Sequence, residues 1–130
     1  MAETVYKASH RRAPGSAKKM RLVIGMIRNK KVPAARDILR YTPKRAAYFI
    51  DRVLQSAIAN AENTGQVDVD DLVVRRAWID EGPTRKGRWK FAAHGRVRPI
   101  LKRSSHIHVE LAEAPEETEQ PGRKGKKAKE

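Results

Sequence analysis

The 130-residue sequence contains no cysteine. This absence excludes a disulfide framework and a zinc site with thiolate ligands, and it fits a reducing compartment. The sequence also lacks any apolar run close to the roughly 20 residues that a membrane-spanning helix needs. Its opening stretch "MAETVYKASHRR" has no apolar core of the signal-peptide kind. We therefore expect the protein to stay in the cytoplasm.

Acidic residues are few compared with basic ones. The chain has 29 Lys and Arg against 15 Asp and Glu, which gives a formal net charge of +14. A polyanionic partner relieves the repulsion among so many positive charges, and nucleic acid is the first candidate. A membrane surface would require a basic amphipathic helix with a bulky apolar face or a lipidation signal. Neither accompanies the basic residues, so we expect no membrane partner.

Two long stretches hold no acidic residue at all. The stretch "GPTRKGRWKFAAHGRVRPILKRSSH" spans residues 82–106, and the other runs from Lys7 to Lys31. Solvated faces usually mix charges of both signs, so we interpret both stretches as binding surfaces. The basic residues of the first are Arg85, Lys86, Arg88, Lys90, Arg96, Arg98, Lys102 and Arg103. Those of the second are Lys7, Arg11, Arg12, Lys18, Lys19, Arg21, Arg28, Lys30 and Lys31.

Apolar residues at three- and four-residue spacing predict three helices. The first follows Ser16, which can cap it, and ends near Asn29 in a left-handed conformation. The second has Pro33 in its first turn, and Thr42-Pro43 opens the third, which stops at "NTG" (63–65). The third should be the core helix, because its apolar face is the longest. That face comprises Ala46, Phe49, Ile50, Val53, Leu54, Ala57, Ile58 and Ala61.

Strand patterns flank the helices at residues 4–9, 72–79 and 106–111, and a three-stranded sheet is their simplest assembly. The last two candidates become antiparallel neighbours only if residues 82–104 run out and return as a hairpin. At about 3.3 Å per residue, each half would extend on the order of 35 Å from the body. We therefore expect a long basic β-hairpin at about residues 80–105.

A chain of this length suits one domain. We expect that domain to cover residues 1–112. Residues 113–130 change from an acidic block to a basic one and lack bulky apolar side chains, so they cannot bury enough surface to order themselves. They should form a disordered charged tail.

Aromatic and basic residues alternate in Arg88-Trp89-Lys90-Phe91. In an extended chain the two aromatic rings share one face and the two cations the other. Bases or sugars could stack on one face while phosphates meet the other. The alternative is that the rings only pack across the ribbon. An isolated two-stranded ribbon is marginal in water, so we expect the hairpin to order against its partner.

The sequence offers little support for a catalytic or metal site. Gly82 and Gly87 have P-loop spacing, but Arg88 and Trp89 occupy the positions that require Lys and Ser or Thr. The short run 104–106, Ser-Ser-His, has no orienting partner for a nucleophilic triad. We therefore expect no enzyme activity, no cofactor and no small-molecule substrate.

Two further pairs of polar residues lie near the ends of the expected hairpin. His106 and His108 share one face of a strand but lack an evident third ligand, so we expect no metal. Asp80 and Glu81 are strand neighbours that point to opposite faces and do not form an acid/base pair. We interpret them as ion-pair partners of nearby Arg or Lys at the base of the hairpin.

A DNA-bending architectural protein of the histone-like kind is the main alternative. Such proteins also use basic β-ribbon arms, often with Pro at the tip, a place that Pro99 would suit. They require an obligate dimer to present two arms. The expected core helix can bury its face within a single chain, so we favour a different class.

Four segments resemble a known family. They are "KKMRLVIGMIRNKK" (18–31), "SAIANAEN" (56–63), "DEGPTRKGR" (80–88) and "KRSSHIHV" (102–109). In this order they resemble the bacterial large-subunit ribosomal protein L-twenty-two, with similarity from about Tyr6 to Leu111. The resemblance implies an α+β fold, in which three helices pack on a three-stranded antiparallel sheet with a long protruding hairpin. It also implies binding to large-subunit ribosomal RNA beside neighbouring ribosomal proteins, support of subunit assembly, and a hairpin that lines the polypeptide exit tunnel.

The resemblance also implies roles for individual residues. Ala17 stands where the family commonly has Pro, which leaves the start of the first helix to Ser16. The tip facing the tunnel and the nascent polypeptide would comprise Ala92, Ala93, His94 and Gly95. RNA would be contacted by Arg11, Arg12, Lys18, Lys19, Arg21, Arg85, Lys86, Arg88, Trp89, Lys90, Arg96, Arg98, Lys102 and Arg103.

Overall fold

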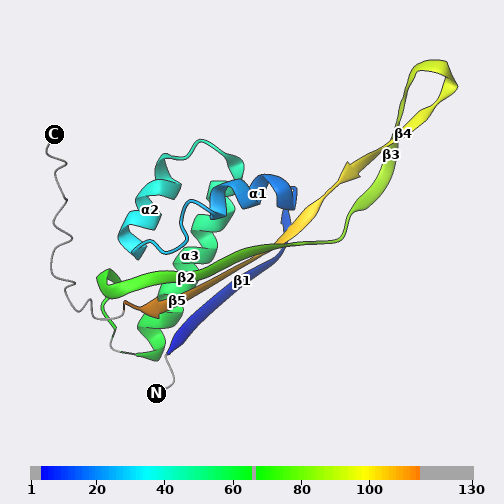
Figure 1. Ribbon diagram of the computed structural model, residues 1–130. Helices are drawn as coiled ribbons and strands as arrows, with labels where there is room; N and C mark the ends of the chain where they lie inside the picture. Colours follow the sequence, from blue (N-terminus) through cyan, green and yellow to red (C-terminus); the bar gives the residue numbers. More distant parts are fainter. Residues whose placement is uncertain (1–3, 66, 115–130) are drawn as a thin grey trace, which may run out of the picture.

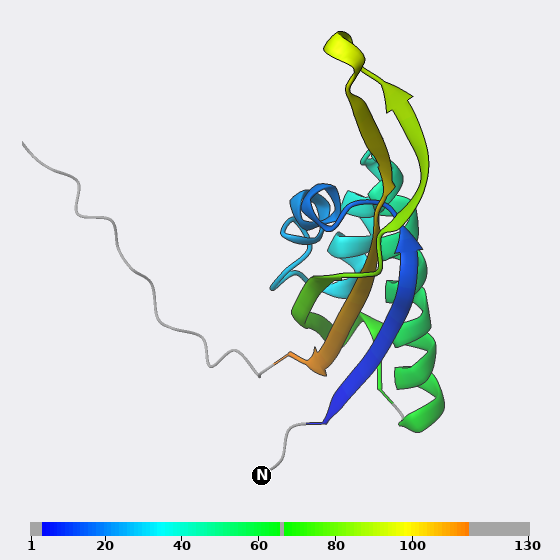
Figure 2. The ribbon, with the colours of Figure 1, turned by 90° about the vertical axis from the view of Figure 1, so that its right-hand side faces the viewer.

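The computed structural model describes residues 4–65 and 67–114 as a small α+β body with one long arm (Figure 1). Three helices pack on one face of a three-stranded sheet, and a two-stranded ribbon extends outward from it (Figure 2). The elements in chain order are β1 (Val5–Pro14), α1 (Ala17–Ile24), α2 (Val32–Tyr41), α3 (Arg45–Thr64), β2 (Leu72–Glu81), β3 (Arg85–Phe91), β4 (Val97–Lys102) and β5 (Ser104–Glu113). The expected fold class is confirmed.

The sheet and its contacts extend into the first two residues of the segment 113–130, which was expected to form a disordered tail. Glu113 is the last residue of β5, and the Ala114 amide donates a 2.8 Å hydrogen bond to the carbonyl of Asp71. The rest of that segment, residues 115–130, lies outside the described residues.

Strand β5 occupies the centre of the sheet and pairs antiparallel with β1 on one side and β2 on the other. Its side chains alternate between the two faces, as its sequence predicts. Ile107, Val109 and Leu111 face the helices and are fully buried. Hydrophobic burial contributes about 1.5–3 kcal/mol for a side chain of this size, so the central strand is a major source of stability.

The predicted core helix is confirmed as α3. Its Ile50, Leu54 and Ala57 are fully buried, and the helix packs against β1 and β5. Its Asn60 side chain donates a 2.9 Å hydrogen bond to the Lys7 carbonyl on the outer edge of β1. The apolar face of α3 is therefore covered within one chain, without a second copy.

The helix ends differ in part from the prediction. Asn29 adopts the expected left-handed conformation (φ 60°), but α1 ends at Ile24, and a series of turns follows it. Thr42 does not open α3. Its amide and its hydroxyl both donate to the Ile38 carbonyl, at 3.1 and 2.6 Å, so it ends α2 instead. A threonine can bond to the preceding turn as readily as it can cap a following one, and the sequence does not separate the two.

The outer edge of β2 is covered by the segment that follows α1. Asn29 and Lys30 exchange two 2.9 Å main-chain hydrogen bonds with Val74. The Arg28 guanidinium donates a 2.8 Å hydrogen bond to the carbonyl of Ala77. An uncovered edge would invite pairing with another chain, and these contacts prevent it along part of β2.

The arm joins the sheet at a junction formed by Gly82, Pro83 and Ser104. The Gly82 amide donates to the Ser104 carbonyl at 2.9 Å, and the Ser104 hydroxyl donates to the Pro83 carbonyl at 2.6 Å. A Cβ atom at Gly82 would lie 2.6 Å from the Ser104 hydroxyl oxygen and 3.1 Å from its carbonyl carbon. Only glycine therefore fits this position without displacing its neighbour. The adjacent Ser105 is fully buried, and its hydroxyl donates to the Met20 sulfur at 2.8 Å.

The junction leads to a stability prediction. Gly82→Ala should lower the free energy of unfolding by about 1–3 kcal/mol, because the new methyl group overpacks the junction and displaces the Ser104 hydroxyl from Pro83. Gly87→Ala is the matched control, since a Cβ there would meet nothing within 4 Å, and it should change stability by less than about 0.5 kcal/mol. Thermal and denaturant unfolding measure both values. Equal values for the two variants would contradict the assigned packing of the junction.

Candidate nucleic-acid interface

The pairing of β3 with β4 gives the arm two chemically different faces. Residues directly opposite each other in an antiparallel pair point to the same face. One face carries the pairs Arg85 with Lys102, Arg88 with Ile100, and Lys90 with Arg98. The other carries Lys86 with Leu101, Trp89 with Pro99, and Phe91 with Val97. We call the first the cationic face and the second the aromatic face.

A β-bulge at Gly87 keeps these faces continuous along the arm. Lys86 and Arg88 pair with the consecutive residues Leu101 and Ile100, so Gly87 is an extra residue in β3. If Gly87 were instead paired as a regular strand residue, strict alternation would put Arg88 on the same face as Lys86. The bulge therefore aligns the basal and distal cations on one face of the arm.

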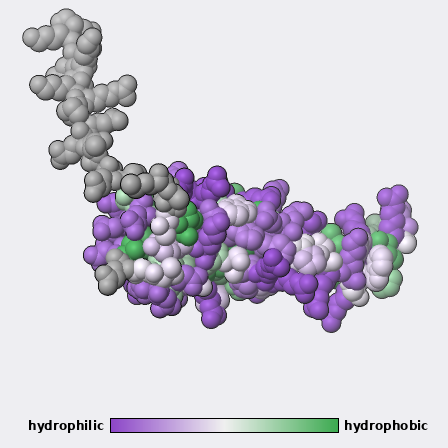
Figure 3. Space-filling model, turned by 90° about the horizontal axis from the view of Figure 1, so that it is seen from below, coloured by the Kyte–Doolittle hydropathy of each residue, from purple (hydrophilic) through white to green (hydrophobic). Residues whose placement is uncertain are grey.

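The two aromatic rings of the arm are exposed. Trp89 is 68% exposed and Phe91 is 90% exposed. Rings that merely packed across the ribbon would be covered by their neighbours, so this exposure favours a role in contacting a partner. The space-filling view shows hydrophilic side chains along the arm and apolar patches near its end (Figure 3).

The basic side chains of the arm have no counter-ions within the described part of the chain. Lys7 contacts Glu110, and His108 contacts Asp80, and both of these pairs lie in the body. An exposed guanidinium or ammonium group without a carboxylate keeps all its hydrogen-bond donors available. A polyanion can therefore bind the basic side chains of the arm without breaking any ion pair that these side chains make within the described part of the chain.

The four expected tip residues lie in the loop that joins β3 to β4. The loop is closed by a 2.7 Å hydrogen bond from the Ala92 amide to the Arg96 carbonyl. His94 and Gly95 both adopt left-handed conformations, at φ 59° and 67°. Two successive left-handed residues let the chain reverse in a short loop.

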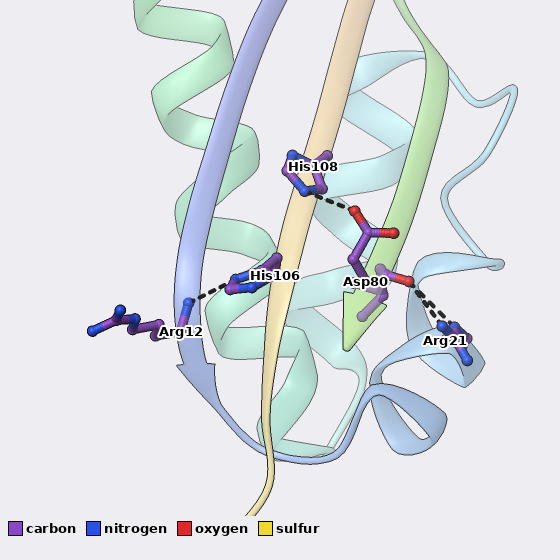
Figure 4. A network of polar contacts seen from close by, with 6 residues as sticks. Arg12, Arg21, Asp80, His106 and His108 are labelled. Carbon is purple, nitrogen blue, oxygen red and sulfur yellow. Dashed lines mark hydrogen bonds and ion pairs between the residues drawn. The ribbon is translucent and has the colours of Figure 1, made fainter. Parts of the chain in front are cut away.

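The basic residues of the body differ in how freely they can contact a partner. Arg12 lies in the β1 bulge, where its amide donates a 3.1 Å hydrogen bond to the His106 ring and its side chain extends away from the sheet (Figure 4). Arg21 instead uses two guanidinium nitrogens to bond the Ile79 carbonyl, at 3.1 and 3.3 Å. The neighbouring Arg11 and the α1 lysines, Lys18 and Lys19, are exposed.

The polar residues at the base of the arm form internal contacts. Asp80 pairs with His108 at 3.2 Å, where an Arg or Lys partner was expected (Figure 4). The His108 ring also stacks on Trp78, with ring centres 5.0 Å apart. The part of the chain that the structure describes contains no group of three or more side chains that could hold a metal ion. Within the same residues, no helix is long and apolar enough to cross a membrane.

Sequence reasoning missed one basic residue at this end of the body. Arg45, the first residue of α3, lines a cleft together with Lys19 of α1 and with Lys102 and Arg103 at the end of β4. The available signal was an arginine at a helix start whose first turn has no acidic residue. Its proximity to the arm depends on tertiary packing.

Comparison with known families agrees with the geometry. The family model described as ribosomal protein L22p/L17e matches residues 8–112, from β1 through the whole arm and nearly to the end of β5. This family comprises structural ribosomal proteins that bind ribosomal RNA and have no enzyme activity. The match therefore excludes the histone-like alternative. The chain belongs to the ribosomal protein L22p/L17e family.

Proposed function

We propose that the arm inserts between segments of large-subunit ribosomal RNA, that it supports subunit assembly, and that its tip lines the polypeptide exit tunnel beside the nascent chain. The separation of the two faces is the observation that carries this proposal. The cationic face suits phosphates, and the exposed rings of the aromatic face suit unstacked bases. A ribbon with different chemistry on its two sides can hold two RNA segments at once and so fix their relative positions.

The RNA-binding residues are proposed on the same grounds. Those on the arm are Arg85, Lys86, Arg88, Trp89, Lys90, Arg96, Arg98, Lys102 and Arg103. Those on the body are Arg11, Arg12, Lys18, Lys19 and Arg21. Arg21 has the weakest support among them, because two of its donors already bond Ile79.

The salt dependence of RNA binding tests the cationic contacts. Each phosphate neutralised by a basic residue releases counter-ions, so affinity falls with salt in proportion to the number of contacts. Replacing Arg85, Lys86, Arg88 and Lys90 with Gln should reduce the slope of log K against log salt by roughly three units. The measurement is filter binding to large-subunit ribosomal RNA at several salt concentrations.

A control with the same loss of charge separates local contacts from net charge. Arg36, Arg40, Arg52 and Arg76 are exposed on the body, outside both acid-free stretches. Replacing these four with Gln should leave most of the slope intact. Equal losses in the two variants would mean that net charge alone drives binding, against the arm assignment. The arm variant should also accumulate precursor particles in sucrose gradients of reconstituted subunits.

The aromatic face predicts a loss of affinity with no change in slope. Phe91→Ala should weaken RNA binding by about 1–3 kcal/mol, roughly 5- to 150-fold, because it removes a stacking surface and no charge. Tyr41→Ala is the matched control, since Tyr41 is 81% exposed and lies at the end of α2. Filter binding at one salt concentration measures both variants. An affinity unchanged by Phe91→Ala would contradict stacking on this face.

Thiol cross-linking tests the tunnel position of the tip. The chain has no cysteine, so Ala93→Cys introduces a unique thiol in the tip loop. In reconstituted ribosomes stalled during translation, this thiol should cross-link to the nascent polypeptide. Ala34→Cys on α2 is exposed as well and should give no such product. Cross-linking from both positions, or from neither, would place the tip elsewhere.

A further inference from the structure

A cleft of about 700 Å³ lies where the arm meets the body. Its walls come from three parts of the chain that are distant in sequence: the start of α1, the start of α3, and the end of β4. The arm leaves the body at this end of the molecule (Figures 1 and 2). Whatever occupies the cleft therefore touches both the body and the arm.

Four positive charges line the cleft, and no acidic residue does. They belong to Lys19, Arg45, Lys102 and Arg103. Within the described residues, none of the four has a carboxylate partner; Arg45 lies over the Phe49 ring, 5.5 Å from its centre. Like charges gathered in one concave site repel each other, and an anion placed among them removes that cost.

The starts of two helices, α1 and α3, also border the cleft. The first helical hydrogen bond of α1 runs from the Met20 amide to the Ser16 carbonyl, so the amides of the preceding turn have no acceptor within the helix. Ser16 makes no side-chain capping bond, and the first turns of α1 and α3 contain no acidic residue. Both helix starts thus add the partial positive charge of a helix N-terminus to the positive charge of the cleft.

We propose that this cleft binds a backbone phosphate of the ribosomal RNA and thereby reinforces the direction in which the arm leaves the body. The inference rests on the proposed RNA binding and extends it to a defined site. Lys19 and Arg45 hold the phosphate from the body, while Lys102 and Arg103 hold it from the arm. The junction at Gly82 and Ser104 joins the arm to the sheet, and the phosphate would add a second connection between arm and body.

A double variant tests the site through the full-length protein. Lys19→Gln with Arg45→Gln removes two charges from the cleft and none from the aromatic or cationic face of the arm. It should reduce the salt slope of binding to large-subunit ribosomal RNA by up to about 0.9 units, the contribution of one neutralised phosphate. The matched control, Arg36→Gln with Arg40→Gln, should leave the slope nearly unchanged. Both pairs are exposed, and circular dichroism melting should confirm that each variant folds.

The outcomes separate this inference from the proposed function. If the cleft and control variants behave alike while the arm variant still loses slope, the cleft proposal is overturned and the RNA-binding function stands. If the wild-type protein fails to bind the RNA, the proposed function itself is wrong. A slope lost only in the cleft and arm variants supports both proposals.

Titration with inorganic phosphate gives a second reading that does not depend on RNA. In amide NMR spectra of the full chain, shifts should concentrate at residues 17–19 and 45–46. Shifts of equal size over all basic segments would show nonspecific screening and would overturn the site. The Lys19→Gln, Arg45→Gln variant should lose the localised shifts at the same phosphate concentration.

Discussion

The antiparallel pairing of β2 with β5 is the contact on which both parts of the molecule depend. It brings the apolar residues of both strands onto one face beneath the helices, and it continues outward as the ladder between β3 and β4. At Gly82 and Ser104 the ladder leaves the core, and two short hydrogen bonds hold its strands together there. The packed sheet therefore sets the direction in which the arm leaves the body, even though no side chain of β3 or β4 is buried.

The distribution of charge follows from this division. The body buries its apolar residues in one core and pairs some of its charges internally, as in Lys7 with Glu110. The arm has no core with which to offset its repulsion. Its stability in isolation is limited for that reason, and binding to a polyanion removes the repulsion among its basic side chains. Family membership identifies the polyanion as ribosomal RNA.

The sequence predicted the elements well and their contacts less well. The apolar spacing of α3 and the alternation around Ile107 and Val109 were sufficient, because burial on one face imposes a period that the sequence must follow. Arg45 was missed because only tertiary packing brings the start of α3 near Lys102. Asp80 was assigned to an Arg or Lys partner, whereas the pairing of β2 with β5 places His108 diagonally across from it, within 3.2 Å. The bulge at Gly87 likewise depends on register, which one strand alone does not reveal.

The bulge at Gly87 also limits how the length of the arm can vary among related chains. Inserting one residue in either strand beyond the bulge would turn every more distal side chain of that strand to the opposite face of the ribbon, unless the new residue formed a second bulge. Cations would then stand where rings stand now. Extensions and deletions that preserve binding should therefore occur in steps of two residues, matched between the two strands. The arm can grow or shrink in evolution, but only in whole repeats of the β-pleat.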